Sequence, residues 1–194
     1  ILSDNETEWM MLDLKNPDKS INISKSFGLN ISAVKMFDSS GDNLLIVEDG
    51  NLRKVNIVSQ SISRILAKNV ISYDFFENEI VYVSKKTDGV AVGNLKNVES
   101  DAVEFLHYDD EKIWVALSLF YEDKFLTVVD EGRVAVYKWK TPSSMKEDEV
   151  LEKVLEQEIS FVPKGTYCGH GGEFVVFSDD RSALASITCT FIFA

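Results

Sequence analysis

Residues able to carry chemistry occur close together at only a few positions of this chain. Cys168 and His170 lie two residues apart in a glycine-rich stretch, where a thiolate and an imidazole could together hold a metal ion. The chain has only two cysteines, Cys168 and Cys189, which are too few for a zinc site of the usual four-ligand kind or for a disulfide framework. We therefore predict no metal site, and whether the two cysteines pair stays open.

The remaining candidates are explained more simply by local structure. His107 lies in a strand-like run. The acidic stretches 109–111 and 179–180 fall at expected turns, where short carboxylates accept hydrogen bonds from backbone amides, and their spacing differs from that of an EF-hand loop. The glycines within 169–172 precede an expected strand rather than a helix, so they do not form a phosphate-binding loop. We predict no catalytic, cofactor-binding or metal-binding residue.

A recurring hairpin pattern sets the elements that would position any site. Each copy has an alternating apolar run, a turn of acidic residues, Asn or Gly, and a second apolar run rich in β-branched residues. A polar turn and a third strand follow, and then, in several copies, an outer strand. We expect hairpins at 34–47, 71–83 and 115–129, and a looser one at 159–177 with a long glycine-rich connection at 165–172. We expect third strands at 9–14, 52–57, 90–95, 133–139 and 183–187, and outer strands at 19–24, 61–66 and 102–108.

This recurrence predicts an all-β fold, namely a β-propeller or partial propeller of about four four-stranded antiparallel blades. A β-sandwich is the alternative, but sandwich strands do not normally recur in register as copies of one motif. The aromatic residues of the strands would then form the core between blades. We treat 1–194 as a single propeller-like domain with repeat units at about 1–30 (partial), 31–68, 69–110, 111–157 and 158–194.

Two arrangements of these blades stay open. The N-terminal strands could complete the last blade and close a small four-bladed ring. Alternatively, the chain could be a section of a larger ring, which would expose unpaired strand edges and imply partners or further sequence.

Residues 143–157 break the repeat. Ser143 or Ser144 could cap a helix N-terminus, Glu147 stands at the capping-box position, and apolar residues follow at helical spacing. We expect a short helical or charged insertion here, which either covers a blade edge or docks a partner.

The composition narrows the classes of partner. Twenty Lys+Arg against 32 Asp+Glu give a net charge of -12. We identify no stripe of basic residues that would offset this negative charge locally, so nucleic acid is not an expected partner. No apolar run reaches the length of a membrane span, and the first residues lack the features of a signal peptide. We expect a soluble chain that begins with Ile1 in place of Met and can be part of something longer.

Three segments carry a family resemblance. Residues 9–23, 49–57 and 120–137 resemble the WD40-like β-propeller region of PEGA-domain proteins of Saccharibacteria-type (candidate phylum) bacteria, and the likeness extends over most of the chain. The resemblance implies an envelope protein with an N-terminal membrane anchor and a short β-domain before the propeller, and it brings no catalytic residues. The Trp-Asp pair of WD40 repeats does not occur in this sequence.

These observations give one leading hypothesis and two alternatives. We predict a non-enzymatic binding or scaffolding propeller without cofactor, which engages a protein or cell-envelope partner. From the resemblance we expect it outside the cytoplasm, anchored to the membrane through a segment not present here. The first alternative is a fragment of a propeller enzyme, a glycan hydrolase or lyase with carboxylates at the mouth of its central channel. The second is a cytoplasmic protein-interaction module.

Overall fold

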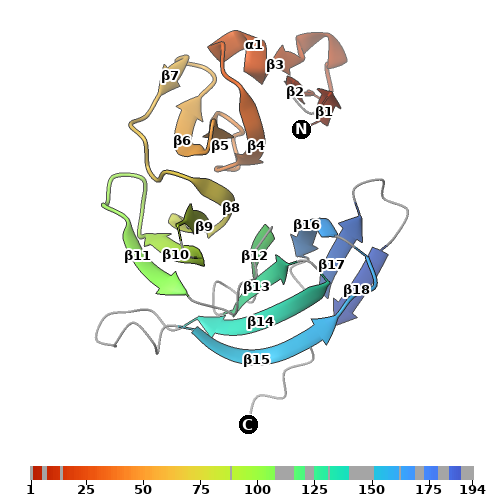
Figure 1. Ribbon diagram of the computed structural model, residues 1–194. Coiled ribbons are helices and arrows are strands. Elements are labelled where there is room, and N and C mark those ends of the chain that lie inside the picture. Colours follow the sequence, from red (N-terminus) through yellow and green to blue (C-terminus); the bar gives the residue numbers. More distant parts are fainter. Residues whose placement is uncertain are drawn as a thin grey trace. The chain divides into compact units, whose positions relative to one another are not determined.

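In the computed structural model, the regular secondary structure is almost entirely β-strand, with one short α-helix and one 3-10 turn among the described residues (Figure 1). The chain divides into two compact units, Ile1–Val70 and Ile71–Ala194. No helix among the described residues is long and apolar enough to cross a membrane. The structure describes residues 2–5, 8–13, 15–87, 89–107, 116–120, 125–130, 132–139, 151–161, 163–168, 173–178 and 184–188.

The first unit starts with a small antiparallel sheet and a short helix. The helix α1 (Ile23–Phe27) begins after Asn22, whose side-chain oxygen accepts a hydrogen bond from the Lys25 backbone N–H at 2.9 Å. It ends at Gly28, which adopts a left-handed conformation with φ +63°. The sheet has the order β1-β2-β3, with β1 at Leu2–Asn5, β2 at Glu8–Met11 and β3 at Ile21–Asn22, and the 3-10 turn η1 (Pro17–Lys19) precedes β3.

The second sheet of this unit has four strands in chain order and contributes most of the core. Its strands are β4 (Ile31–Met36), β5 (Asn43–Glu48), β6 (Asn51–Asn56) and β7 (Ser61–Ile62). Trp9 on β2 packs against this core, and its indole N–H donates to the backbone carbonyl of Ile31 at 2.9 Å. This bond ties the first sheet to the second. The buried cluster consists of Ile23, Ile31, Leu44, Ile46 and Val55.

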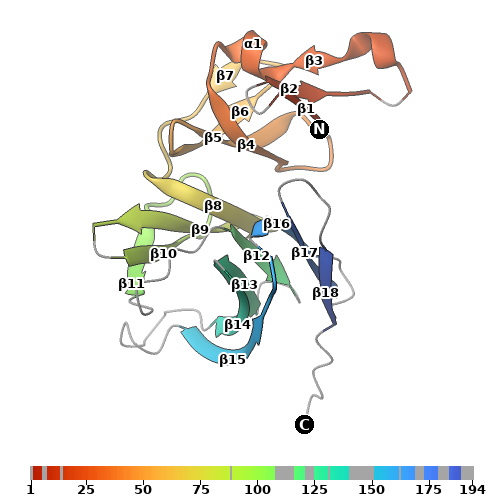
Figure 2. The same ribbon diagram turned by 45° about the vertical axis from the view of Figure 1, so that its right-hand side comes forward.

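The second unit has two four-stranded sheets followed by a three-stranded one, and in each sheet the strands lie in chain order (Figure 2). The first strand of its middle sheet, β12, contacts β9 and β16 of the neighbouring sheets. Such packing of successive sheets buries both faces of the inner strands. The first sheet has β8 (Val70–Phe76), β9 (Glu79–Lys86), β10 (Gly89–Leu95) and β11 (Val103–His107); the middle sheet has β12 (Ala116–Phe120), β13 (Phe125–Asp130), β14 (Arg133–Trp139) and β15 (Leu151–Glu158); the last has β16 (Pro163–Cys168), β17 (Glu173–Ser178) and β18 (Leu184–Thr188).

Three of the strand aromatics expected in the core are buried, whereas Phe37, Phe75, Phe76 and Phe161 are half-buried. Tyr73 on β8, Tyr82 on β9 and Tyr137 on β14 are 2%, 0% and 3% exposed. Each therefore contributes most of its apolar surface to the core.

The same side-chain cap follows β2, β6 and β10. In each case a side-chain oxygen accepts hydrogen bonds from the backbone N–H groups two and three residues later. The distances are 2.8 and 3.2 Å for Asp13, 3.1 and 2.8 Å for Asn56, and 2.9 and 2.9 Å for Asn97. The cap satisfies backbone donors at the point where strand pairing stops, so each of these strands ends in a defined turn.

The prediction of a helix within 143–157 is wrong for the second half of that range. Residues 151–157 lie in β15, which pairs with β14 as the outer strand of its sheet, and 143–150 lie outside the described residues. The register shifts between Val136 and Tyr137, because Leu155 pairs with Val136 and Lys153 with Tyr137, so Val154 is an extra residue. This bulge interrupts the two-residue alternation of a strand and leaves apolar residues at a spacing that imitates a helix.

Three other expected elements have different bounds. The outer strand expected at 19–24 is reduced to β3, because the cap at Asn22 starts α1 one residue later. The connection expected at 165–172 is shorter, because 165–168 belong to β16. The outer strand expected at 61–66 is paired as β7 only at Ser61–Ile62, with a further bridge between Leu52 and Ala67.

The sheets fit a partial propeller. The described strands form three four-stranded and two three-stranded sheets, and β1, β2 and β3 form a sheet of their own instead of completing the last one. Of the two arrangements left open by the sequence, this pairing fits a section of a ring better than the four-bladed closure. The single-domain interpretation and its repeat boundaries stay predictions.

Candidate interaction surface

The residues singled out for chemistry in the sequence are not brought together. His107 ends β11 and Cys168 ends β16, in different sheets. His170, Cys189 and the acidic stretches 109–111 and 179–180 lie outside the described residues. Within the described ranges, no three His, Cys, Asp or Glu residues are grouped so that they could hold a metal ion.

A polar network on the sheet β8–β11 links an inner strand to the outer strand. Tyr82 on β9 lies opposite Gly93 on β10, which lies opposite Glu104 on β11. A Cβ atom at position 93 would stand 2.0 Å from the Cζ atom of Tyr82, so glycine is required for the ring to cross β10. The Tyr82 hydroxyl donates to Oε1 of Glu104 at 3.0 Å, Ser84 donates to the same oxygen at 3.3 Å, and Lys86 forms an ion pair with Oε2.

The surroundings fix the charge states of this network. Burial, together with the charge and hydrogen bond of Glu104, raises the pKa of Tyr82, so its hydroxyl stays protonated. Burial also acts to raise the pKa of Glu104, but the hydrogen bonds from Lys86 and Tyr82 outweigh it, and the net pKa lies below the ordinary value. Glu104 is thus ionised at neutral pH with three donors around it, which suits a structural acceptor and not a general acid.

Within each of the other two four-stranded sheets, charged side chains also link an inner strand to an outer segment of the same sheet. On the sheet β12–β15, the buried Arg133 donates to Oε2 of Glu156 on the outer strand at 3.1 Å, and Lys153 contacts the same oxygen at 2.7 Å. On the sheet β4–β7, Arg53 forms an ion pair with Glu48 at 3.2 Å and donates to the backbone carbonyl of Ser63, just after β7, at 3.1 Å. These charges hold outer segments to inner strands and are largely neutralised in doing so.

The outer margin of the sheet β4–β7 carries exposed apolar side chains. We call residues 57–69, which include β7, the rim segment. Val58 and Ile62 are 73% and 42% exposed, and Val58 is the most exposed large apolar side chain in the described part of the chain. The rim segment also carries exposed Arg64 and Lys68. It therefore combines apolar contact area with positive charge.

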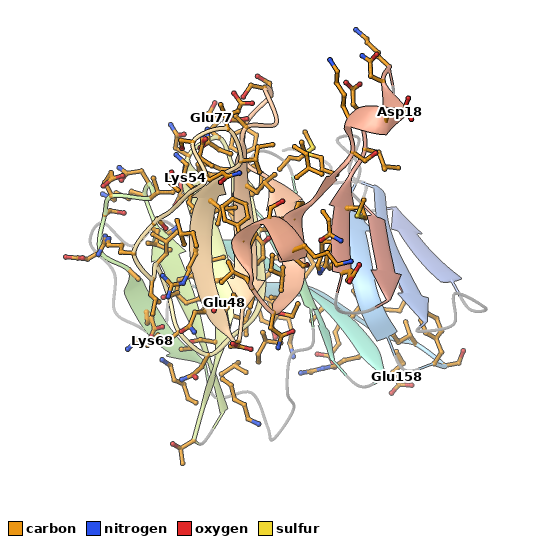
Figure 3. All side chains as sticks on the ribbon, turned by 90° about the horizontal axis from the view of Figure 1, so that it is seen from above. Asp18, Glu48, Lys54, Lys68, Glu77 and Glu158 are labelled. Carbon is orange, nitrogen blue, oxygen red and sulfur yellow. The ribbon has the colours of Figure 1, made fainter. Side chains whose placement is uncertain are left out.

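Lysine residues lie toward both ends of the sheet β4–β7. Figure 3 shows Lys54, on the neighbouring strand β6, toward one end of this sheet and Lys68 with Glu48 toward the other. The Lys54 ammonium stands 5.9 Å from the centre of the Phe37 ring, which gives a cation–π contact.

The charge pattern behind this surface was missed in the sequence. Residues 50–73 contain four Lys or Arg and no Asp or Glu, although the whole chain has 32 acidic residues. The first unit has eight Lys+Arg and nine Asp+Glu, whereas the second has 12 and 23, so net charges are -1 and -11. Counting the charged residues separately in each repeat unit would have revealed this uneven distribution, which the net charge of the whole chain does not show.

The backbone of the rim segment is not a continuous strand edge. β7 has two residues, and beyond it the Ser63 N–H donates to the Lys54 carbonyl at 2.8 Å and the Leu66 N–H to the Leu52 carbonyl at 2.8 Å. Such a short, interrupted edge with basic side chains is a poor template for adding another strand. Recognition at the rim segment would therefore depend on its side chains.

Comparisons with solved structures define the class of fold. No protein-family model and no curated protein sequence matches the chain. The β-propeller domain of Myceliophteria thermophila Cps50 (Swd1) is similar over 96% of this chain and 65% of that one, with 11% identity and a TM-score of 0.62. The N-terminal domain of Nup159 is similar over 95% of this chain and 56% of that one, with 14% identity and a TM-score of 0.60.

A third similar structure is the complex of KlAtg21 with the coiled coil of AgAtg16, at 13% identity, with 94% of this chain and 56% of that one covered and a TM-score of 0.57. At these identities the likeness shows the fold alone: the chain has a β-propeller fold. The chain spans between 56% and 65% of the length of these three solved chains.

Proposed function

We propose that this chain is a non-enzymatic propeller that binds a partner protein and acts as a scaffold. The observation that carries the proposal is the rim segment, which exposes Val58 and Ile62 and also carries the exposed basic residues Arg64 and Lys68. Apolar contact area with a polar margin is the usual anatomy of a protein contact. The described carboxylate networks, by contrast, are engaged in holding strands together.

Structures of similar fold support a protein partner. KlAtg21 is seen in complex with the coiled coil of AgAtg16, and S. cerevisiae Dbp5 is seen bound to Nup159. These partners belong to those proteins. They support the general idea that a propeller of this kind presents contact surfaces to other proteins.

Quantitative affinity capture tests the proposal. The full chain, immobilised, is exposed to the soluble extract of its source cells, and bound proteins are quantified against an unrelated globular protein of similar net charge. We expect one or a few proteins to be enriched and, after purification, to bind the chain saturably in calorimetry. Enrichment no greater than on the control protein would contradict protein binding as the function.

The envelope location is a separate part of the proposal. It rests only on the resemblance of 9–23, 49–57 and 120–137 to the propeller region of PEGA-domain proteins. Fractionation of source cells tests it. The protein is expected with the membrane fraction, through an anchor outside this chain, and recovery from the cytosol would favour a cytoplasmic interaction module.

A further inference from the structure

We infer that the rim segment recognises an acidic segment of a partner protein that carries one or two apolar side chains among its carboxylates. The inference rests on the proposed protein-binding function and adds the chemistry of the partner. Charge complementarity is the first argument, because the rim segment carries Arg64 and Lys68 and no acidic residue.

The second argument is the position of the apolar residues. Val58 lies in the turn before β7 and Ile62 lies on β7, so both belong to the same stretch as Arg64 and Lys68. An acidic segment that also has an apolar residue can bury Val58 or Ile62 while its carboxylates meet the basic side chains. The buried apolar area supplies affinity, and the charges supply orientation and association rate.

The third argument excludes strand addition as the binding mode. The rim segment pairs with β6 discontinuously and β7 has only two residues, so an added strand would find few backbone partners. The partner is therefore expected to bind through its side chains. Nucleic acid, which is also acidic, is disfavoured because the rim segment has only two basic residues for phosphate contacts and no aromatic residue for base stacking.

Peptide selection on the full chain tests this inference. A phage library of random peptides of about 12 residues is selected on the immobilised chain. Selected peptides are then titrated against the chain and against two rim variants, Arg64→Glu with Lys68→Glu, and Val58→Ser with Ile62→Ser. We expect net-acidic peptides with apolar residues, bound at least about tenfold more weakly by either rim variant.

Matched variants separate the rim from general surface effects. Lys15→Glu with Lys19→Glu makes the same change in charge at two exposed lysines before β3, and Leu12→Ser with Met36→Ser removes two exposed apolar side chains elsewhere in the first unit. Both are expected to leave affinity within about twofold. All four variants replace exposed residues, so their thermal unfolding should match that of the parent chain.

Each other outcome overturns the inference. Peptides that bind the rim variants as well as the parent would place the contact elsewhere and leave the proposed protein-binding function standing. A library that yields no peptide above the bare support would refute the rim as a peptide site, while the capture experiment decides the proposed function on its own. A mixed-sequence single strand of about 20 nucleotides that binds the parent more tightly than any peptide, and loses binding in the charge-reversed rim variant, would assign the rim to nucleic acid instead.

Discussion

At the scale of single residues, one glycine decides how the sheet β8–β11 is held together. Gly93 leaves room for the Tyr82 ring to cross β10, and the ring carries its hydroxyl to Glu104 on the outer strand. The role of Gly93 is steric, because its φ is not in the left-handed region. Glycine in a strand interior is otherwise unfavourable, so this contact accounts for its presence.

We therefore expect Gly93→Ala to lower the free energy of unfolding by about 1–3 kcal/mol, because the added methyl group overlaps the buried ring. Urea denaturation measures the change. In a Tyr82→Leu background the crossing ring is absent, and the same Gly93→Ala substitution should cost much less. Equal costs in the two backgrounds would show that the ring contact is not the cause.

The charge of Glu104 gives a prediction for pH dependence. Its pKa is lowered in the folded chain, so its ionised form stabilises folding above the ordinary value of 4.5, and this contribution is lost as the pH falls through the lowered pKa. Glu104→Gln keeps a hydrogen-bond acceptor and removes the charge. Because the side chain is 34% exposed, we expect a loss of no more than about 1 kcal/mol at neutral pH.

Chemical denaturation of the parent chain and of Glu104→Gln across pH checks this expectation. The difference in unfolding free energy should narrow as the pH falls below about 4. Glu77→Gln, at an exposed carboxylate in the turn between β8 and β9, is the matched control. A gap that stays constant down to acidic pH would mean that the charge of Glu104 does not contribute.

At the scale of elements, the side-chain caps after β2, β6 and β10 define where strands end. Asn97 illustrates the cap, since its side-chain oxygen accepts two backbone hydrogen bonds at 2.9 Å. Asn97→Ala should lower the unfolding free energy by about 0.5–1.5 kcal/mol, whereas Asn97→Asp keeps the acceptor and should cost less. Thermal unfolding compares them with Lys96→Ala at the neighbouring exposed position. Equal effects of Ala and Asp at position 97 would argue against the cap.

The outer strand β15 depends on a partly buried ion pair. Arg133 is 7% exposed at its side chain, and Glu156 on β15 is 37% exposed. Glu156→Ala should lower the free energy of unfolding, because it removes one partner of a buried guanidinium. Glu158→Ala, two residues along the same strand, is the control and should cost less than about 0.5 kcal/mol. Hydrogen exchange of the β15 amides should rise in the first variant only, and unchanged exchange would show that the pair does not hold β15.

At the scale of the whole molecule, charge is distributed unevenly. The first unit is close to neutral and the second carries nearly all of the net charge. Contacts at the rim segment are solvent-exposed, so salt screens them. We expect the affinity of a rim-selected peptide to fall as NaCl rises from about 50 to about 500 mM, and the Arg64→Glu with Lys68→Glu variant to show little salt dependence. Salt-independent affinity in the parent chain would show that charge does not guide this contact.

Most of the β-architecture could be predicted from the sequence. Alternating hydrophobic residues, interrupted by turns that contain Asp, Asn and Gly, predicted the bounds of β14 correctly at 133–139. The same pattern predicted β6 and β10 to within one residue. These predictions succeeded because strand periodicity and turn chemistry are local properties of the sequence. The same reasoning failed at β15. There, the extra residue Val154 is a bulge whose existence depends on pairing with β14, and local spacing alone resembles a helix.

The amino-acid sequence by itself determined the all-β repeat, the low number of metal-binding side chains and the acidic total, since each follows from residue order and composition. Only the tertiary structure decided that Tyr82 crosses Gly93 to reach Glu104, that Arg133 is paired across strands, and that Val58 and Ile62 are exposed. These facts join residues that are distant in the chain or depend on what covers a side chain. These contacts and exposures depend on strand pairing and burial, which local periodicity in the sequence does not specify.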